Sequence, residues 1–170
     1  MLWIIVLGVA TGMRTFTAMA VFCWFMWFAR LPVTGLNAWT ASVVSVVVFT
    51  VLALGEYYGD TLARTPSRKS LFPLLARLVF GAGVGALVAS SFTEPLAGGV
   101  LLGIAGALIG TYGGYSARMY LAGRVGDDFP VAVGESAVAV VLSVVAMWFV
   151  CVDIVGQAQE VMLRVLGAFS

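Results

Sequence analysis

The chain has 170 residues, of which 62% are hydrophobic and only 10% charged, and its mean hydropathy is +1.07. A soluble domain carries roughly 25% charged residues, so the composition excludes an ordinary soluble enzyme and predicts a membrane protein. The net charge of +1 gives no field that would attract a nucleic acid, and the lack of histidine removes the commonest metal ligand and general base.

Five apolar stretches are long enough to cross a bilayer, which takes about 20 residues of helix. They cover residues 2–28, 37–58, 72–92, 95–119 and 130–152. The first lacks the basic start and small-residue cleavage site of a signal peptide, so it is expected to stay as a span. Residues 154–170 predict an amphipathic surface helix or a partly ordered tail. We therefore expect an all-α membrane protein with five transmembrane helices in one domain, residues 1–170.

Lysine and arginine are distributed unevenly between the two sides of these spans. The loops after the second and fourth spans, with their flanks, hold six of them, whereas the opposite side holds only Arg30 and Arg164. Basic residues favour the cytoplasmic side of a membrane. With five spans, this predicts a cytoplasmic N-terminus and a C-terminus outside. The six residues are Arg64, Arg68, Lys69, Arg77, Arg118 and Arg124.

Glycines recur along the third and fourth spans at intervals of three or four residues, which place them on one face of each helix. Small residues at this spacing let helix backbones approach closely in lipid. The pattern predicts glycine-rich packing of the third and fourth spans, or alternatively a self-association face or a groove for an acyl chain. The glycines are Gly81, Gly85, Gly99, Gly103, Gly106, Gly110 and Gly114.

Arg14 is the charged residue near the middle of the first span. A charge at this depth costs about 2.5–3.5 kcal/mol, which makes it a functional candidate by default. Gly12 can interrupt the helix just before it. If the helix restarts there, its free amides, the guanidinium and the hydroxyls of Thr15 and Thr17 would form an anion site. The alternative is a structural ion pair between Arg14 and Glu135 of the fifth span.

Glu56, Asp60 and Arg64 follow one another at four-residue steps and predict one polar face at the end of the second span. If Glu56 is buried beside Glu135, the two carboxylates could share a proton or hold a cation. Basic residues at the same membrane face predict contacts with lipid headgroups, although the positive-inside rule alone also puts them there. These residues are Arg64, Arg68, Lys69, Arg77 and Arg118.

Three strings support a resemblance to a known family: Gly12-Met13-Arg14-Thr15-Phe16-Thr17, then Asp60 with Pro66-Ser67-Arg68, then Pro130-Val131-Ala132-Val133-Gly134-Glu135. In this order they resemble the small bacterial membrane proteins catalogued as domain of unknown function 4126. The resemblance covers nearly the whole chain and implies a multi-pass protein of the bacterial inner membrane, without naming a substrate. The chain departs from the family pattern where it has Thr61 for lysine, Ala63 for proline and Ser136 for aspartate.

Two functions fit these features. The first is a small transporter or channel-like protein that moves an ion or small anionic solute, with Arg14, Thr15, Thr17, Glu56, Asp60 and Glu135 lining its pathway. The second is a non-transporting protein that binds lipid or assists membrane assembly. No nucleotide loop, zinc motif or nucleophile with a base is found, so an enzyme is less expected, and no cofactor or metal is predicted. The expected partners are membrane lipids and further copies of the chain.

Overall fold

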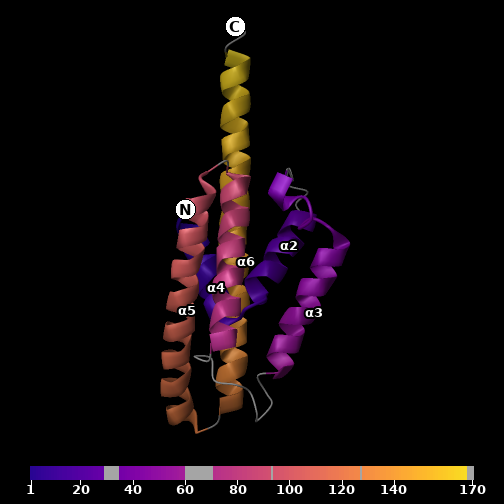
Figure 1. Ribbon diagram of the computed structural model, residues 1–170. Coiled ribbons are helices and arrows are strands. Elements are labelled where there is room, and N and C mark those ends of the chain that lie inside the picture. Colours follow the sequence, from indigo (N-terminus) through magenta and orange to yellow (C-terminus); the bar gives the residue numbers. More distant parts are fainter. Residues whose placement is uncertain (29–34, 60–70, 93, 127, 168–170) are drawn as a thin grey trace.

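The computed structural model describes residues 1–28, 35–59, 71–92, 94–126 and 128–167 of the chain (Figure 1). Within these ranges it is built from α-helices and turns. The elements are α1 (Leu2–Met13), α2 (Thr17–Phe28), a 3-10 turn η1 (Gly35–Asn37), α3 (Val43–Gly59), α4 (Leu71–Ser91), α5 (Leu96–Val125) and α6 (Asp128–Gly167). Three of the described helices, α4, α5 and α6, are long and apolar enough to cross a membrane, whereas α1, α2 and α3 are shorter.

Helix α1 runs alongside α5 in the same direction. Gly8 of α1 faces Gly106 of α5, and one turn later Gly12 faces Gly110. Helix α5 in turn runs antiparallel to α4 and α6 (Figure 1). Accordingly, Trp3 at the start of α1 stacks on Phe149 in the far half of α6, with ring centroids 4.3 Å apart.

Helix α2 runs back in the opposite direction. Phe16 packs on Phe80 of α4, and the Met19 side chain lies near Gly83 one turn farther along, where an added Cβ would be 3.8 Å from its Cε. Helix α2 is therefore parallel to α4. Residues 2–28 therefore form a helical hairpin, in which both helices open toward the same end of the bundle (Figure 1). The prediction that these residues form one spanning helix is wrong, because the chain reverses between Met13 and Thr17.

This reversal also changes the placement of the chain ends. The N-terminus lies in the half of the bundle toward which α6 and the C-terminus extend (Figure 1). A single helix over residues 2–28 would put the two termini at opposite ends of the bundle, whereas the reversal puts them toward the same end. The sides of the membrane on which the termini lie stay a prediction.

The turn η1, which precedes α3, is anchored to the end of α4 by a buried amide. Asn37 is 2% exposed, and its Nδ2 donates to the carbonyl of Leu87 at 3.1 Å and to the hydroxyl of Ser91 at 2.7 Å. Ser90 donates to the Asn37 side-chain oxygen at 2.8 Å. The chain needs this turn before α3 begins at Val43, which is why the helix starts later than the expected boundary at residue 37.

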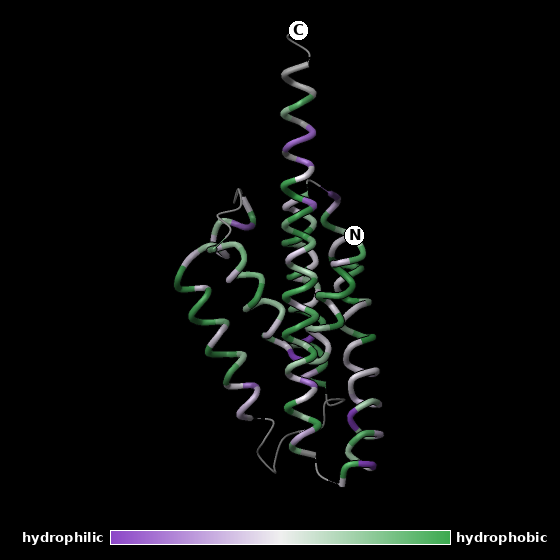
Figure 2. The backbone as a smooth tube through the Cα atoms, turned by 180° about the vertical axis from the view of Figure 1, so that it is seen from behind, coloured by the Kyte–Doolittle hydropathy of each residue, from purple (hydrophilic) through white to green (hydrophobic). Residues whose placement is uncertain are grey.

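The last two helices are longer than predicted. Helix α5 continues past residue 119 to Val125 and ends where Gly126 takes a left-handed conformation, with φ +80°, that glycine adopts without steric cost. Helix α6 has 40 residues and continues unbroken through residues 154–167, so the expected boundary near Val152 and a separate tail are wrong. Figure 2 shows that the more hydrophilic part of α6 lies in the segment that projects beyond the bundle.

Helix α5 packs against both α1 and α4, and its glycines occupy the points of closest approach. A Cβ on Gly103 would collide with the carbonyl oxygen of Gly81 in α4, and one on Gly106 with the carbonyl oxygen of Ile5 in α1. Close backbone contact is therefore possible only while these positions lack a side chain. Farther along α5, a Cβ on Gly113 would meet open space.

We expect Gly103→Ala to destabilise the protein by about 1–3 kcal/mol, because the added methyl forces α4 and α5 apart. Thermal unfolding of the purified protein in detergent measures the effect. Gly113→Ala is the matched control, and its better helix propensity should leave stability unchanged or raise it by up to about 1 kcal/mol. Equal unfolding temperatures for the two variants would contradict the packing described above.

Candidate functional site

The tip of the helical hairpin is a polar part of the buried core. Helix α1 ends at Met13 because Arg14 has an extended backbone, with φ −139° and ψ 113°, and α2 begins at Thr17. Arg14 is 1% exposed and Thr15 is 7% exposed. Two helix ends therefore meet inside the bundle, and each leaves backbone groups without partners in its own helix.

Glu56 of α3 satisfies the amides at the start of α2. Its two carboxylate oxygens accept hydrogen bonds from the backbone nitrogens of Thr15, at 2.8 Å, and Phe16, at 3.1 Å. The positive end of a helix dipole stabilises an anion at this position. The sequence predicted an anion site where the helix restarts, and the structure places a carboxylate of the chain itself there.

The end of α1 is satisfied from α5. The hydroxyl of Thr111 donates to the carbonyl of Gly12 at 3.2 Å, and the backbone nitrogen of Arg14 donates to the carbonyl of Ala10 at 2.8 Å. A guanidinium next to the negative end of a helix is also electrostatically favourable. Both helix ends at the tip therefore depend on side chains from neighbouring helices.

The Arg14 side chain connects the tip to α6 and α3. Its Nη2 donates to the carbonyl of Ala132 at 3.0 Å, and its guanidinium carbon lies 5.4 Å from the centre of the Tyr57 ring. The Tyr57 hydroxyl shares a hydrogen bond of 2.7 Å with Thr17. Four of the residues singled out in the sequence are thus brought together: Arg14, Thr15, Thr17 and Glu56.

Glu135 lies one turn after Ala132 in α6 and forms an ion pair with Arg118 of α5. The Arg118 Nη1 and Glu135 Oε2 are 3.7 Å apart, and the side chains are 14% and 6% exposed. The Glu135 carboxylate fits against α5 because Gly114 has no side chain: a Cβ there would lie 3.1 Å from Glu135 Oε1. Gly114 therefore makes room for a charge, in contrast to the glycines that admit another helix backbone.

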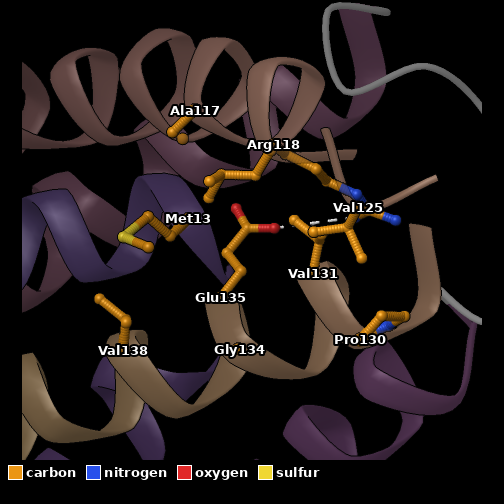
Figure 3. Close-up of a pocket in the computed structure, with 11 residues that line it drawn as sticks. Met13, Ala117, Arg118, Val125, Pro130, Val131, Gly134, Glu135 and Val138 are labelled. Atoms are coloured by element: carbon orange, nitrogen blue, oxygen red, sulfur yellow. Dashed lines mark ion pairs between the residues drawn. The ribbon is translucent and has the colours of Figure 1, made fainter. Parts of the chain in front are cut away.

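A pocket of about 470 Å³ lies beside this ion pair, between α5 and α6 (Figure 3). Helix α5 packs less extensively on α6 than on α1 and α4, and this looser contact leaves the space. Met13 at the end of α1 closes one side, so the pocket reaches the hairpin tip. Apart from Arg118 and Glu135 its lining is apolar: Met13, Gly114, Ala117, Leu121, Val125, Pro130, Val131, Gly134 and Val138.

The basic residues expected at lipid headgroups are only partly described. Arg77 is 4% exposed within α4, so it is not the accessible headgroup contact that was predicted. Arg118 belongs to the ion pair in the pocket. Asp60, Arg64, Arg68 and Lys69 lie outside the described residues. Among the residues that the structure does describe, no group of three or more potential ligands could hold a metal ion.

Sequence reasoning missed three groups at the tip. Tyr57 directly follows Glu56, and Thr111 directly follows Gly110, one of the regularly spaced glycines, so a neighbouring residue that was already singled out could have pointed to each. The Ala132 carbonyl had none, because any residue supplies that group.

No family model matches the chain, and neither a curated protein nor a solved structure matches it. The resemblance to the domain of unknown function 4126 proteins therefore stays a prediction. The function has to be inferred from the chemistry of the hairpin tip and the adjoining pocket.

Proposed function

We propose that the protein is a small multi-pass transporter or channel-like protein that moves an ion or small anionic solute past the tip of the re-entrant hairpin. One observation carries this proposal: the hairpin tip, with Arg14, ends inside the bundle, where Glu56 of α3 binds its amides, and it adjoins a pocket that contains a charged pair. Discontinuous helices with their ends at the binding site are a recurring design of membrane transporters.

The depth of the tip supports this interpretation. Phe16 packs on Phe80, with ring centroids 4.9 Å apart, and Phe80 lies near the middle of the 21-residue α4. The tip is then near the midplane if α4 crosses the bilayer. Non-helical backbone at such depth is tolerated only where it is buried in protein or lines a water-filled cavity. Its charged groups are costly there, which favours a functional role.

The membrane arrangement follows from the same geometry. Helices α4, α5 and α6 each cross the bilayer, and α3, about 25 Å long at roughly 1.5 Å per residue, crosses beside the hairpin. Basic residues concentrate in the chain between α3 and α4 and at the end of α5, so this end lies in the cytoplasm. Four crossings and one hairpin then put both termini outside, in a bacterial inner membrane.

In this arrangement the two halves of the pathway differ. The pocket at Arg118 and Glu135 occupies the cytoplasmic half, and the hairpin fills the outer half down to its tip. A solute that leaves the pocket toward the outside has to displace the tip. The hairpin therefore acts as the barrier, and its charged residues meet the solute first.

Flux into proteoliposomes tests the proposal, with chloride, inorganic phosphate and decanoate as probes. The wild-type protein should transport at least one of them, and Arg14→Gln should slow it by about tenfold or more, which corresponds to about 1.4 kcal/mol on the barrier. Arg14→Lys, which keeps the charge but loses the planar fork, should be affected less. Correct folding of each variant is checked by gel filtration and thermal unfolding.

Arg124→Gln is the matched control, because Arg124 stacks on Tyr120 in the last part of α5 and is exposed. Its flux should stay within about twofold of the wild type. Absence of flux for all three probes in folded wild-type protein would overturn the proposal and favour a non-transporting lipid-binding protein.

A further inference from the structure

The end of α6 extends beyond the rest of the bundle. Among the described residues, Ile154 is the last of α6 that packs on the hydrophobic core, and the helix continues unbroken to Gly167. Its final part therefore projects away from the other helices (Figure 1). The 40 residues of α6 are about twice the length that crosses a bilayer, so residues 155–167, here called the projecting segment, lie in water when α6 crosses a membrane.

The side of α6 that faces the bundle becomes polar where the bundle ends. Ala146 and Val150 are buried, and the same row continues at steps of three and four residues through Asp153, Gln157 and Glu160. These three polar residues are exposed. This side therefore changes from apolar to polar as its surroundings change from protein to water.

A second row, on the opposite side of α6, stays apolar past the end of the bundle. We call it the outer row. Lipid covers such residues inside a membrane, but Val155 and Met162 lie in the projecting segment, where they are 58% and 64% exposed. Exposed apolar residues that line up in water mark a surface that a partner covers. The outer row consists of Val145, Trp148, Val152, Val155, Gln159 and Met162, all of which are exposed.

The spacing of the outer row is that of a parallel coiled coil. Its members alternate at steps of three and four residues, which gives the seven-residue repeat by which two helices keep the same faces in contact. Gln159 is the one polar member of the row, and a single polar residue at such a position helps to set the register of the pair. The Gln159 amide both donates and accepts hydrogen bonds, so two copies of it can bind each other.

A second copy of the chain fits this row. Copies of a membrane protein are inserted in one orientation and at one depth, so their α6 helices meet parallel and in register. Gly156 and Leu163, which flank the row, are uncharged, and identical helices therefore meet there without charge repulsion. The projecting segment also has a length, about 12–15 residues, at which an isolated helix is marginal in water. A partner helix supplies the contact that stabilises it.

We propose that the outer row of α6 pairs with the same row of a second copy, as a parallel coiled coil that continues from the membrane into water. The polar row with Asp153, Gln157 and Glu160 then faces the solvent. This inference goes beyond the proposed function and does not depend on it. The glycines that were considered as a self-association face contact helices of their own chain instead, as Gly103 does with Gly81.

Cysteine cross-linking in native membranes tests the pairing. With Cys23 and Cys151 replaced by alanine, Val155→Cys and Met162→Cys should form disulfide-linked dimers on mild oxidation, because facing residues of the pair lie within disulfide reach. Gln157→Cys, at nearly the same depth on the polar row, should give at most about one tenth of that yield, because its Cβ points away from the partner. Equal yields on the two rows, or no dimer at either outer position, would overturn the proposal.

Two substitutions should change the dissociation constant of the dimer in opposite directions. Val155→Glu places an unpaired charge in the interface and should raise the constant by about tenfold or more. Gln159→Leu replaces a polar residue of the row by an apolar one and should lower it. Gln157→Glu is the matched control on the polar row and should change it by less than about twofold. Analytical ultracentrifugation of the full chain in neutral detergent measures the constant, and a folded Val155→Glu variant that associates like the wild type contradicts the pairing.

The membrane surface is the competing partner for the outer row. If the projecting segment bends onto the bilayer, a fluorophore on Met162→Cys is quenched by brominated lipids in proteoliposomes, and a fluorophore on Gln157→Cys is quenched less. That result would replace the coiled coil by a surface helix. Pairing between two copies predicts weak quenching at both positions, together with the cross-link at Met162→Cys.

Discussion

Replacing Glu56 with alanine is expected to destabilise the protein by about 3 kcal/mol or more. The Glu56 carboxylate accepts hydrogen bonds from the amides of Thr15 and Phe16, at 2.8 and 3.1 Å, in the part-buried hairpin tip. A hydrogen bond to a charged group contributes about 1.5–3 kcal/mol, and a buried amide that loses its partner adds a desolvation cost. The loss of stability is measured as a lower unfolding temperature in detergent.

Two further variants serve as controls. One keeps the shape of the Glu56 side chain without its charge, and the other removes a carboxylate elsewhere in the protein. Glu56→Gln keeps one acceptor oxygen in nearly the same place, so it should lose about half as much stability as the alanine variant. Glu94→Ala removes an exposed glutamate and should change stability by no more than about 0.5 kcal/mol. If Glu56→Ala unfolds at the same temperature as Glu94→Ala, Glu56 does not hold the tip.

The hairpin predicts that both chain ends lie on the same side of the membrane, so cysteines at the two ends should either both be labelled from outside or both be protected. With Cys23 and Cys151 replaced by alanine, single cysteines are introduced at three exposed positions: Leu2→Cys, Leu163→Cys and Val125→Cys. A membrane-impermeant maleimide added to intact cells should label the first two and leave the third unlabelled. Permeabilised cells should show labelling of all three, which confirms that each cysteine is reactive.

The three positions test the hairpin and the orientation separately. Leu2→Cys and Leu163→Cys should behave alike in either orientation, because α1 and α6 extend to the same end of the bundle (Figure 1). If Leu2→Cys is labelled together with Val125→Cys, the hairpin is contradicted. If only Val125→Cys is labelled from outside, the hairpin stands and the cytoplasmic assignment of the basic end is overturned.

The sequence identified the position of the hairpin tip but not its geometry. Arg14 after Gly12 indicated an interruption, because a charge at that depth needs a partner and glycine weakens a helix. A kinked helix that crosses the membrane and a chain that reverses direction both have apolar helices on either side of the interruption, so the sequence pattern does not distinguish them. The direction of α2 depends on contacts such as Phe16 with Phe80, which no local pattern encodes.

The pairing of the charges depended on tertiary contacts in the same way. The sequence suggested Glu135 as a partner for Arg14 but gave no sign of two further contacts: Arg118 lies 3.7 Å from Glu135, and the carbonyl of Ala132 lies 3.0 Å from Arg14. The sequence gives the depth of each acidic residue but not the face that its helix turns toward its neighbours, so several acidic residues could pair with the same arginine. The end of α6 was missed for another reason: hydropathy falls after Val152, but no proline or capping sequence stops the helix there.

Helix α3 contacts the rest of the bundle mainly through α2, and its Glu56 holds the amides at the start of that helix. A movement of α3, which lies at the edge of the bundle, is therefore passed on to the hairpin tip. If α3 tilts because the bilayer thins or comes under lateral tension, the displacement passes through one carboxylate to the place where α1 and α2 meet.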